Sequence, residues 1–393
     1  MGRARHPLAL VVTILFLVVL PWTITARGLR ADETAVTGDD GIDRIDLLPP
    51  GESNPRNSEG DFIELTDGRL LFAYTHFTNG RGDHADAHIA ARISDDKGYT
   101  WSSDDTVIVP NNGDMNVMSV SLVRTQPVEI ALFYLMKNSL ADCRPVVRFS
   151  HDEAQTWSEP VPIIPDSEVG YYVLNNDRVV QLSSGRLVVP LANHTNGKIG
   201  KWDKRANMVC YLSDNVGRTW RCSQGQVDRD SPGHESVVRQ EPGIVELKDG
   251  RLMMFMRTSA GCQYLAYSSD QGDTWTDLQS SDLIGPISPA SIERIPSTGD
   301  LMAVYNDHAN VAAAYRNKRT PLHISISQDE GQTWQHRLVV EDNVDKWYCY
   351  TAIGFVDDYV LLGHCAGKRV AGKLNGLEAT QITRFKVGKL YDK

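Results

Sequence analysis

The sequence predicts an all-β fold, a six-bladed β-propeller whose blades are four-stranded antiparallel sheets. Three observations lead to this prediction. An eight-residue motif ending in Thr-Trp recurs five times, an apolar strand–turn–strand pattern recurs six times in step with it, and no long helical pattern lies between the repeats. The tryptophans of the motif stand at positions 101, 157, 220, 275 and 334, which are 56, 63, 55 and 59 residues apart. That period fits four short strands, or one propeller blade, and is too long for one rung of a β-solenoid.

The eight-residue motif predicts a tight turn. Its Ser and Asp side chains can accept hydrogen bonds from backbone N–H groups, its Gly can adopt a positive φ, and its Trp can anchor the turn on a blade. The second copy has Ala154 in place of Gly and the third has Asn215 in place of Asp, so we expect these two turns to be weaker. The copies are SDDKGYTW from Ser94, SHDEAQTW from Ser150, SDNVGRTW from Ser213, SSDQGDTW from Ser268 and SQDEGQTW from Ser327.

The strand–turn–strand pattern predicts one hairpin in each blade. Asp-Gly or a similar pair between alternating apolar residues is the strongest short-range signal of a hairpin. Six such units place one propeller domain at residues 45–393. They are FIELTDGRLLFAY from Phe62, VSLVRTQPVEIALFY from Val120, RVVQLSSGRLVVPLA from Arg178, GIVELKDGRLMMFMR from Gly243, ASIERIPSTGDLMAVYN from Ala290 and TAIGFVDDYVLLG from Thr351.

Two segments precede the predicted propeller. Residues 1–27 combine basic residues, an apolar run and the small-residue exit TITA, which is typical of a secretory signal peptide; an uncleaved N-terminal membrane anchor is the alternative. Residues 28–44 are acidic and turn-rich and are interpreted as a leader. We therefore expect a secreted, periplasmic or cell-surface protein.

Charge and cysteine usage exclude some classes of function. The formal net charge is −10 and no basic stripe is present, so a nucleic-acid partner is not expected. The chain has six cysteines but no Cys-x-x-Cys pair, which gives no support for a zinc site. Cys210 and Cys222 flank one turn and could form a disulfide, and buried free thiols are the alternative.

The five octapeptides resemble the Asp-box (BNR) motif of the sialidase superfamily, whose fold is a six-bladed β-propeller. The resemblance covers nearly all of the chain after the leader. It implies an enzyme that binds a sugar carboxylate with three arginines and uses a Tyr nucleophile, a Glu that assists it and an Asp acid/base, without a metal or organic cofactor. A neutral Tyr suits this chemistry because an anionic sugar repels a carboxylate nucleophile. Asp boxes also occur in lyases and non-catalytic binding propellers, so the motif by itself predicts fold.

Four residues in the later blades match the family's site. Glu241 and Arg257 flank one hairpin, so both ends would lie at the same mouth of the propeller. Arg319 stands just before the strand that leads into the fifth octapeptide, the place of the third arginine. Tyr350, followed by Thr, matches the nucleophile, with Tyr348 as the alternative on the same strand face.

The first blade matches less closely. Arg56 is the only arginine near the expected place, and it lies about two residues further from the turn than the family pattern implies. Asp83 is the candidate acid/base, although strict register would put that position at Gly82. The histidines and acids of this loop lack a diagnostic ligand spacing, so no metal site is predicted.

Three functions follow from these residues. The leading hypothesis is an exported, exo-acting, retaining glycoside hydrolase that acts on a carboxylated glycan. The second is a lyase of uronic-acid polysaccharides in which His84 or Tyr350 handles the C5 proton. The third is a non-catalytic glycan-binding propeller. Asn176 and Asp177, at the entrance to an inner strand of the third blade, are candidate sugar contacts or simply a cap on a turn.

Overall fold

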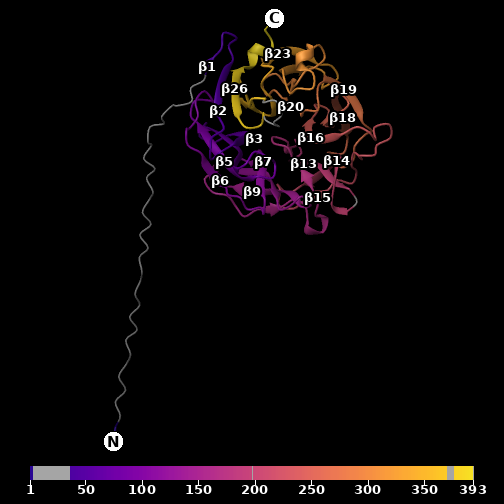
Figure 1. Ribbon diagram of the computed structural model, residues 1–393. Coiled ribbons are helices and arrows are strands. Elements are labelled where there is room, and N and C mark those ends of the chain that lie inside the picture. The colour runs from indigo at the N-terminus through magenta and orange to yellow at the C-terminus, as the bar shows by residue number, and fades with distance from the viewer. Residues whose placement is uncertain (3–35, 197, 370–375, 393) are drawn as a thin grey trace.

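The computed structural model describes residues 1–2, 36–196, 198–369 and 376–392. Six antiparallel sheets are arranged in a ring, and in four of them four strands follow one another in order (Figure 1). The only helices in the described ranges are three short 3₁₀ helices, η1 (Asp166–Glu168), η2 (Ala313–Tyr315) and η3 (Val387–Leu390). The prediction of an all-β, six-bladed propeller is confirmed.

The strands are assigned to blades in chain order, from the inner strand outward. Blades 1 to 3 comprise β3 (Arg56–Glu64), β4 (Leu70–Asn79), β5 (Asp86–Ser94) and β6 (Thr106–Val109); β7 (Asn116–Gln126), β8 (Glu129–Lys137), β9 (Cys143–Ser150) and β10 (Val161–Pro162); and β11 (Tyr172–Val173), β12 (Val180–Gln181), β13 (Leu187–Asn196), β14 (Lys198–Ser213) and β15 (Arg221–Cys222). Blades 4 to 6 comprise β16 (Arg239–Glu246), β17 (Leu252–Thr258), β18 (Cys262–Ser268) and β19 (Gln279–Ile284); β20 (Ser291–Arg294), β21 (Leu301–Tyr305), β22 (Leu322–Ser327) and β23 (Gln335–Glu341); and β24 (Cys349–Val356), β25 (Tyr359–Cys365), β26 (Thr380–Lys386), β2 (Asp43–Leu48) and β1 (Val36–Thr37).

The N-terminal strands close the ring. Strand β2 pairs with β26, and β1 pairs with β2, so the indigo and yellow ends of the propeller lie side by side (Figure 1). Residues from Val36 onward therefore belong to blade 6, earlier than the boundary expected at residue 45. Their acidic, turn-rich composition hides the strands, which form because the edge of β26 offers unpaired backbone groups.

The predicted signal segment, residues 1–27, lies outside the described residues apart from residues 1 and 2. Within the described part of the chain, no helix has the length and apolar character needed to cross a membrane.

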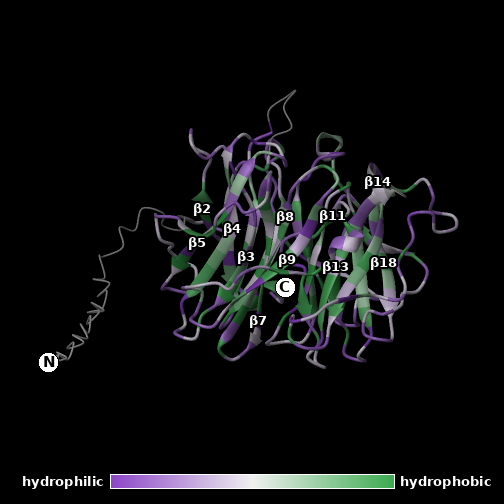
Figure 2. Ribbon diagram, turned by 90° about the horizontal axis from the view of Figure 1, so that it is seen from below, coloured by the Kyte–Doolittle hydropathy of each residue, from purple (hydrophilic) through white to green (hydrophobic). Residues whose placement is uncertain are grey.

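Apolar side chains gather between neighbouring blades. Each of the six blade–blade interfaces has its own cluster of buried residues, and the sixth joins Ile45 and Leu47 of β2 to Phe62 and Phe72 of blade 1. Figure 2 shows the apolar segments in the strands and the hydrophilic ones mainly in the loops. Burial of these faces at about 25 cal/mol per Å² drives blade packing and leaves the strand ends free to carry polar side chains.

The five octapeptides form the turns that the sequence predicts. In the first, Ser94 Oγ accepts the N–H of Gly98 at 2.8 Å, Asp96 accepts the N–H and hydroxyl of Thr100 at 2.7 Å each, and Trp101 donates to the Gly98 carbonyl. Ala154 keeps the corresponding bond in the second copy, with φ +65°. Ser94 pairs with Leu70 while Arg56 pairs with Phe77, so these turns lie at the end of the blade away from where the inner strand begins.

All six cysteines are free thiols. Cys210 is buried and Cys222 is exposed, and the Cα partner of Cys222 across the ladder is Tyr211 rather than Cys210. Of the two expectations for this pair, the structure has free thiols.

Candidate active site

The inner strands of four blades carry a bulge near their beginning. The register shifts between Ser58 and Asp61, Met118 and Ser121, Gln240 and Pro242, and Cys349 and Ala352. Each bulge contains a non-glycine residue in the left-handed region: Glu59 (φ 59°), Ser119 (φ 63°), Glu241 (φ 52°) and Tyr350 (φ 55°). Bulges bend a strand and redirect a side chain, and strained backbone of this kind gathers at functional sites.

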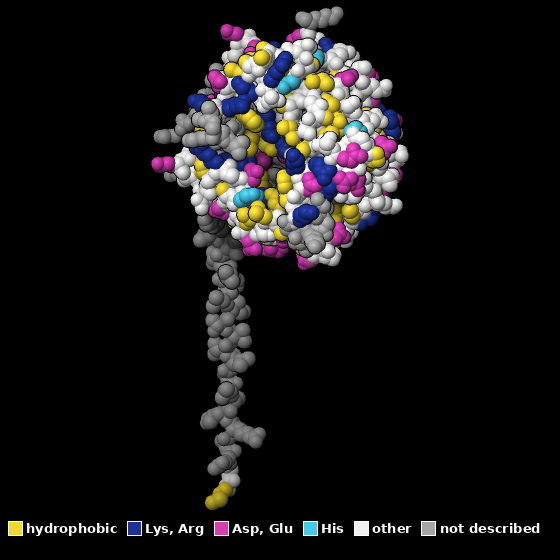
Figure 3. Space-filling model, turned by 45° about the vertical axis from the view of Figure 1, so that its right-hand side comes forward, with side chains coloured by type: hydrophobic (Ala, Val, Ile, Leu, Met, Phe, Trp, Pro, Cys, Tyr) yellow, Lys and Arg dark blue, Asp and Glu magenta, His cyan; other side chains and the backbone are white. Residues whose placement is uncertain are grey.

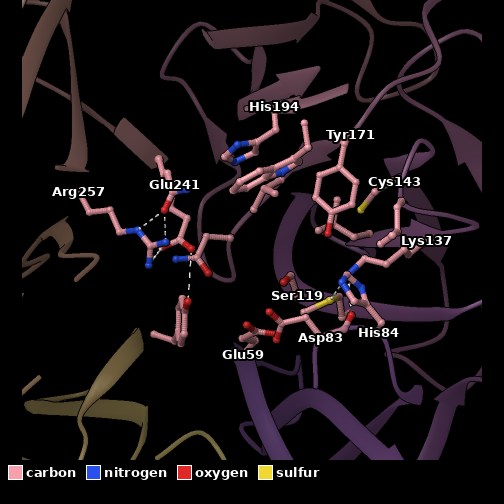
Figure 4. A pocket seen from close by; sticks show the side chains of 18 residues that line it. Glu59, Asp83, His84, Ser119, Lys137, Cys143, Tyr171, His194, Glu241 and Arg257 are labelled. Atoms are coloured by element: carbon pink, nitrogen blue, oxygen red, sulfur yellow. Dashed lines mark hydrogen bonds and ion pairs between the residues drawn. The ribbon is translucent and has the colours of Figure 1, made fainter. Parts of the chain in front are cut away.

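These four side chains line one cavity of about 440 Å³. Glu241 and Arg257 lie on one side of it, while Glu59, Asp83 and His84 lie on the other (Figure 4). Figure 3 shows acidic and basic side chains lying among apolar ones on one face of the molecule. The cavity is within the size range of small-molecule sites and mixes charged with apolar walls.

Tyr350, Glu241 and Arg257 form one connected group. The Tyr350 hydroxyl donates to Glu241 Oε1 at 3.3 Å, and Glu241 Oε2 lies 3.0 Å from Arg257 Nη1. Arg257 also donates through Nε to Gln240 Oε1 at 3.1 Å. Burial, followed by the nearby Glu241 charge, raises the pKa of Tyr350, so the phenol is neutral until a base takes its proton.

Arg319 approaches this group from the loop between β21 and β22. Its guanidinium lies 5.3 Å from the Tyr350 ring centroid, and Nη1 donates to Cys349 Sγ at 3.2 Å. Burial raises the pKa of Cys349, but the Cys365 thiol and the Arg319 charge outweigh it and lower that pKa to about 7. The sequence-predicted residues Tyr350, Glu241, Arg257 and Arg319 are therefore brought together.

Arg56 is 1% exposed and holds two carboxylates on the opposite wall. Its Nη1 donates to Asp83 Oδ1 at 2.6 Å, and its Nη2 lies 3.4 Å from Glu59 Oε1. The Asp83 side chain is 61% exposed and lines the cavity, whereas Arg56 lies behind it. Arg56 is thus paired with acids of the protein itself.

The two acids on this wall have pKa values shifted in opposite directions. Burial raises the pKa of Glu59 to about 7, and the Arg56 charge offsets only part of that effect. Burial also raises the pKa of Asp83, but the charge of Arg56 and its hydrogen bond outweigh burial and hold that pKa below 3.8. Near neutral pH, Glu59 can carry a proton while Asp83 is ionised.

A cationic and aromatic part of the cavity adjoins Asp83. Lys137 is 2% exposed, and its ammonium donates to the Asp83 backbone carbonyl at 2.6 Å. Burial, followed by the Lys137 charge, lowers the pKa of His84, which favours its neutral form. The rings of His194 and Trp202 stack at 5.0 Å, with Trp202 52% exposed at the rim.

Four of the predicted site residues do not line the cavity: Arg56, Arg319, Asn176 and Asp177. Asn176 is buried and donates to the backbone carbonyls of Gly60 and Tyr350 at 2.9 and 3.2 Å, so it ties inner strands together. Asp177 accepts the N–H of Ile353 at 2.9 Å and lines a separate central cavity. The neighbouring Asn175 lines the site instead.

Glu59 and Lys137 line the cavity but are not among the site residues that the sequence predicts. The repeat spacing predicts the position of Glu59, because Glu59 lies nine residues before the hairpin glycine Gly68 and Glu241 lies nine residues before Gly250. The repeat therefore puts both acids at the same place in their blades. Lys137 gave no comparable signal, since only the fold brings the end of β8 beside the Asp83 loop.

Comparison with known proteins agrees with this architecture. The BNR repeat-like domain model matches residues 68–361. The chain belongs to the BNR repeat-like domain family. Its resemblance to the sialidase superfamily is confirmed by relatives of that kind.

One relative of this BNR repeat-like chain is the anhydrosialidase of Macrobdella decora, 26% identical over 256 residues that cover 59% of this chain and 32% of the relative. This chain thus spans about a third of the length of that curated relative. Among solved structures, Trypanosoma rangeli sialidase with 2,3-difluorosialic acid superposes with a TM-score of 0.69, 15% identity and coverage of 91% of this chain and 60% of the other. A Dyadobacter fermentans DSM 18053 protein of unknown function reaches 0.66 at 17% identity, covering 92% of this chain and 100% of its own.

Proposed function

We propose that this chain is an exo-acting glycoside hydrolase resembling exo-α-sialidases, which removes a terminal carboxylated sugar from a glycan. The observation that carries the proposal is the contact between Tyr350 and Glu241, with Arg257 against the same carboxylate at the cavity wall. The relatives named anhydrosialidase and sialidase support an acidic sugar as the substrate. The expected export of the chain stays a prediction.

Tyr350 is the nucleophile in this proposal. Its hydroxyl oxygen forms a bond to the anomeric carbon while the bond from that carbon to the leaving oxygen breaks, and its proton passes to Glu241. The 3.3 Å contact is suitable for that transfer. A neutral phenol approaches an acidic sugar without the charge repulsion that a carboxylate nucleophile would meet.

Arg257 and Arg319 supply the positive charge that holds the sugar carboxylate. They reach the group from the return strand of blade 4 and from the loop before β22, so they can meet one anion from two directions. Planar guanidinium groups suit a carboxylate because they can donate two parallel hydrogen bonds. Arg56 is the predicted third arginine that binds the sugar carboxylate. It already pairs with Asp83 and Glu59, and its contact with the sugar remains a prediction.

Asp83 or Glu59 supplies the proton to the leaving oxygen and then takes one from the water that releases the sugar, which gives net retention of configuration. Asp83 is the sequence prediction and is the more exposed of the two. Glu59 has the pKa, about 7, that suits an acid near neutral pH, and its Oε2 is buried without a hydrogen-bond partner among the described residues.

Hydrolysis of a fluorogenic sialoside tests the proposal. The wild-type chain should release the fluorophore, and Tyr350→Phe should lose at least about 10³-fold in kcat while still binding the sugar. Tyr348→Phe is the matched control, because Tyr348 is fully buried and does not line the cavity. Glycan binding without release in the wild type would reject hydrolysis and favour a binding propeller.

Two substrates with different leaving groups distinguish Asp83 from Glu59 as the acid. A sialoside with a phenol-type leaving group needs little protonation, whereas a sugar leaving group needs it fully. The variant that removes the acid should therefore be far more impaired on sialyl-lactose than on the fluorogenic substrate. Asp83→Asn and Glu59→Gln can be compared in this way, and equal impairment of both substrates by both variants would exclude each as the acid.

A β-eliminating uronate lyase is the second candidate, and one observation favours it. His84 lines the same cavity and has a lowered pKa, so a neutral imidazole that could accept the C5 proton faces the site. Elimination leaves a carbon–carbon double bond next to the carboxylate. New ultraviolet absorbance during incubation with uronate polysaccharides, lost in His84→Gln, would support the lyase and reject hydrolysis.

A further inference from the structure

Blade 5 carries a second group of side chains suited to chemistry, none of which lines the Tyr350 cavity. Asp307 follows β21, His323 lies on β22 and His336 lies on β23. The sequence separates them by 16 and 13 residues, counted from 307 to 323 and from 323 to 336. Their potential ligand atoms nevertheless all lie within 4.8 Å of one another.

The ladder of blade 5 explains why they meet. His323 pairs with Tyr305, and His336 pairs with Ser325. Directly paired residues of antiparallel strands project from the same face, and alternate residues of one strand share a face. Tyr305 packs in the cluster between blades 4 and 5, so the two histidines project from the side of blade 5 that faces blade 4.

Both distances from Asp307 suit a single metal ion. Asp307 Oδ2 lies 3.0 Å from His336 Nδ1 and 3.6 Å from His323 Nδ1. An ion at about 2.1 Å from each atom, the usual zinc–ligand distance, would see angles of about 90° and 120° between these ligands. Both angles lie in the range of a distorted tetrahedral site.

The surroundings orient the ligands and leave one side open. The Asp307 side chain is 9% exposed, and its other oxygen, Oδ1, accepts the N–H of Ala309 at 2.8 Å, which fixes the carboxylate. His323 is 19% exposed and His336 is 56% exposed, so solvent can reach the ion position from the His336 side. Two histidines, one carboxylate and a water molecule make a common zinc ligand set.

A serine–histidine–aspartate relay does not fit these contacts. Ser325 Oγ lies 3.3 Å from Nδ1 of His336, the same nitrogen that faces Asp307. A nucleophilic triad needs the serine and the acid on opposite ring nitrogens. The group therefore has the geometry of a ligand set rather than of a hydrolytic triad.

We propose that Asp307, His323 and His336 form a zinc site that ties the outer strand β23 and the middle strand β22 to the loop after β21. A bound ion links two neighbouring strands to the loop that follows a third and stabilises the folded chain, because the unfolded chain does not hold the three ligands together. The site lies apart from the residues of the hydrolase proposal, so each proposal can fail without the other.

Zinc titration of the full chain, prepared without a histidine tag, tests the site. Cys222→Ser serves as the parent because Cys222 is the exposed thiol and could bind zinc by itself. We expect one tight equivalent of Zn²⁺ per chain by calorimetry and metal analysis, together with a zinc-dependent rise in Tm. Absence of saturable zinc binding in this parent would overturn the proposal.

The ligands are tested by His336→Gln and His323→Gln in the same parent. Each should lower the zinc affinity by about 100-fold or more and remove the rise in Tm, while far-UV circular dichroism shows an unchanged fold. His308→Gln is the matched control, because Nε2 of His308 faces the Thr320 carbonyl at 3.1 Å. Unchanged zinc affinity in His336→Gln and His323→Gln, or an equal loss in His308→Gln, would overturn the assignment. Co²⁺ bound to the parent should give the visible spectrum of a four-coordinate site. This measurement needs no substitution of a proposed ligand.

Discussion

The two ends of the propeller use the same backbone device for different purposes. Each octapeptide turn places two consecutive residues in the left-handed region, as Lys97 and Gly98 do in the first. The inner-strand bulges at the other end also use left-handed residues, but there the residue changes from blade to blade, as with Glu241 and Tyr350. Repetition at one end stabilises the blades, and variation at the other end assembles a set of different side chains around one cavity.

The difference shows where strain is tolerated. In the turns, the left-handed residues are secured because a Ser and an Asp, or Asn215 in the third copy, accept hydrogen bonds from backbone N–H groups, as Ser268 and Asp270 do. In the bulges, the non-glycine residue is held by the flanking strand ladder, and its side chain remains available to the cavity. Changes at the bulges should therefore alter chemistry, while changes at the turns should alter stability.

Glu241→Gly should show the largest effect on activity and the clearest difference between its effects on activity and on stability. Loss of the base should lower kcat/KM on a fluorogenic sialoside by about 10³-fold. The free energy of unfolding should change by less than about 1 kcal/mol, because glycine relieves the left-handed backbone and so offsets the lost ion pair to Arg257. Steady-state kinetics and denaturant melts measure the two quantities. A marked loss of stability with normal kinetics would remove the distinction between the two ends.

The pH dependence of stability should have opposite signs at the two ends. The pKa of Glu59 rises on folding from 4.5 to about 7, so the unfolded chain releases this proton first and stability falls as the pH rises between these values. The effect amounts to about 3 kcal/mol for a shift of this size. Burial raises the pKa of Asp270, but hydrogen bonds from the Thr274 hydroxyl and N–H together outweigh it, so that pKa is lowered on folding. The stability that Asp270 contributes is therefore lost only as the pH falls below 3.8.

Denaturant melts from about pH 2.5 to 8 measure this dependence, so that they include the range in which Asp270 takes up a proton. Glu59→Gln should flatten the decline between pH 4.5 and 7, whereas Asp270→Asn should leave that decline in place and change only the acid side. An identical profile for Glu59→Gln and the wild type would show that Glu59 does not hold its proton in the folded chain.

Asp270→Ala should destabilise the fold without changing the chemistry. It removes the bonds to the Thr274 N–H at 2.9 Å, the Thr274 hydroxyl at 2.6 Å and the Ser268 hydroxyl at 2.7 Å. A loss of about 1–3 kcal/mol is expected because the turn loses its central acceptor. The kcat/KM of the protein that remains folded should equal that of the wild type. A selective loss of kcat would contradict a purely structural turn.

Ala154→Gly should show the smallest effect, a gain of about 0.5–1 kcal/mol, because Ala154 has φ +65° where the other turns have glycine. Thermal melts measure it. Gly98→Ala is the counterpart in the first turn and should destabilise, since a Cβ there would meet Leu361 Cδ2 at 2.3 Å. Loss of stability in Ala154→Gly would mean that the alanine methyl group packs more favourably than the backbone strain costs.

Much of the candidate site can be predicted from the sequence, because its residues occupy fixed positions within the repeat. Glu241, Arg257, Arg319 and Tyr350 stand at fixed distances from hairpins and octapeptides, and the structure brings them together. The sequence also predicts Arg56 and Asp83 as site residues. It does not predict the ion pair between them, because that pair depends on how the loop after β4 folds back. The sequence places Asn176 and Asp177 at the entrance to an inner strand of the third blade. Their side chains bind backbone groups on the inner strands of blades 1 and 6 instead of lining the cavity.

The sequence by itself determined the number of blades, the turns that hold them and the positions from which side chains enter the cavity, because a repeated local pattern encodes a repeated local structure. Only the tertiary structure decided which of those side chains face each other. The raised pKa of Glu59 arises from burial at the cavity wall, and the ring closes through a strand, β2, that begins in the acidic leader. The meeting of Asp307 with two histidines depends on the register of three strands. Such properties depend on contacts between segments far apart in the chain, which no local pattern records.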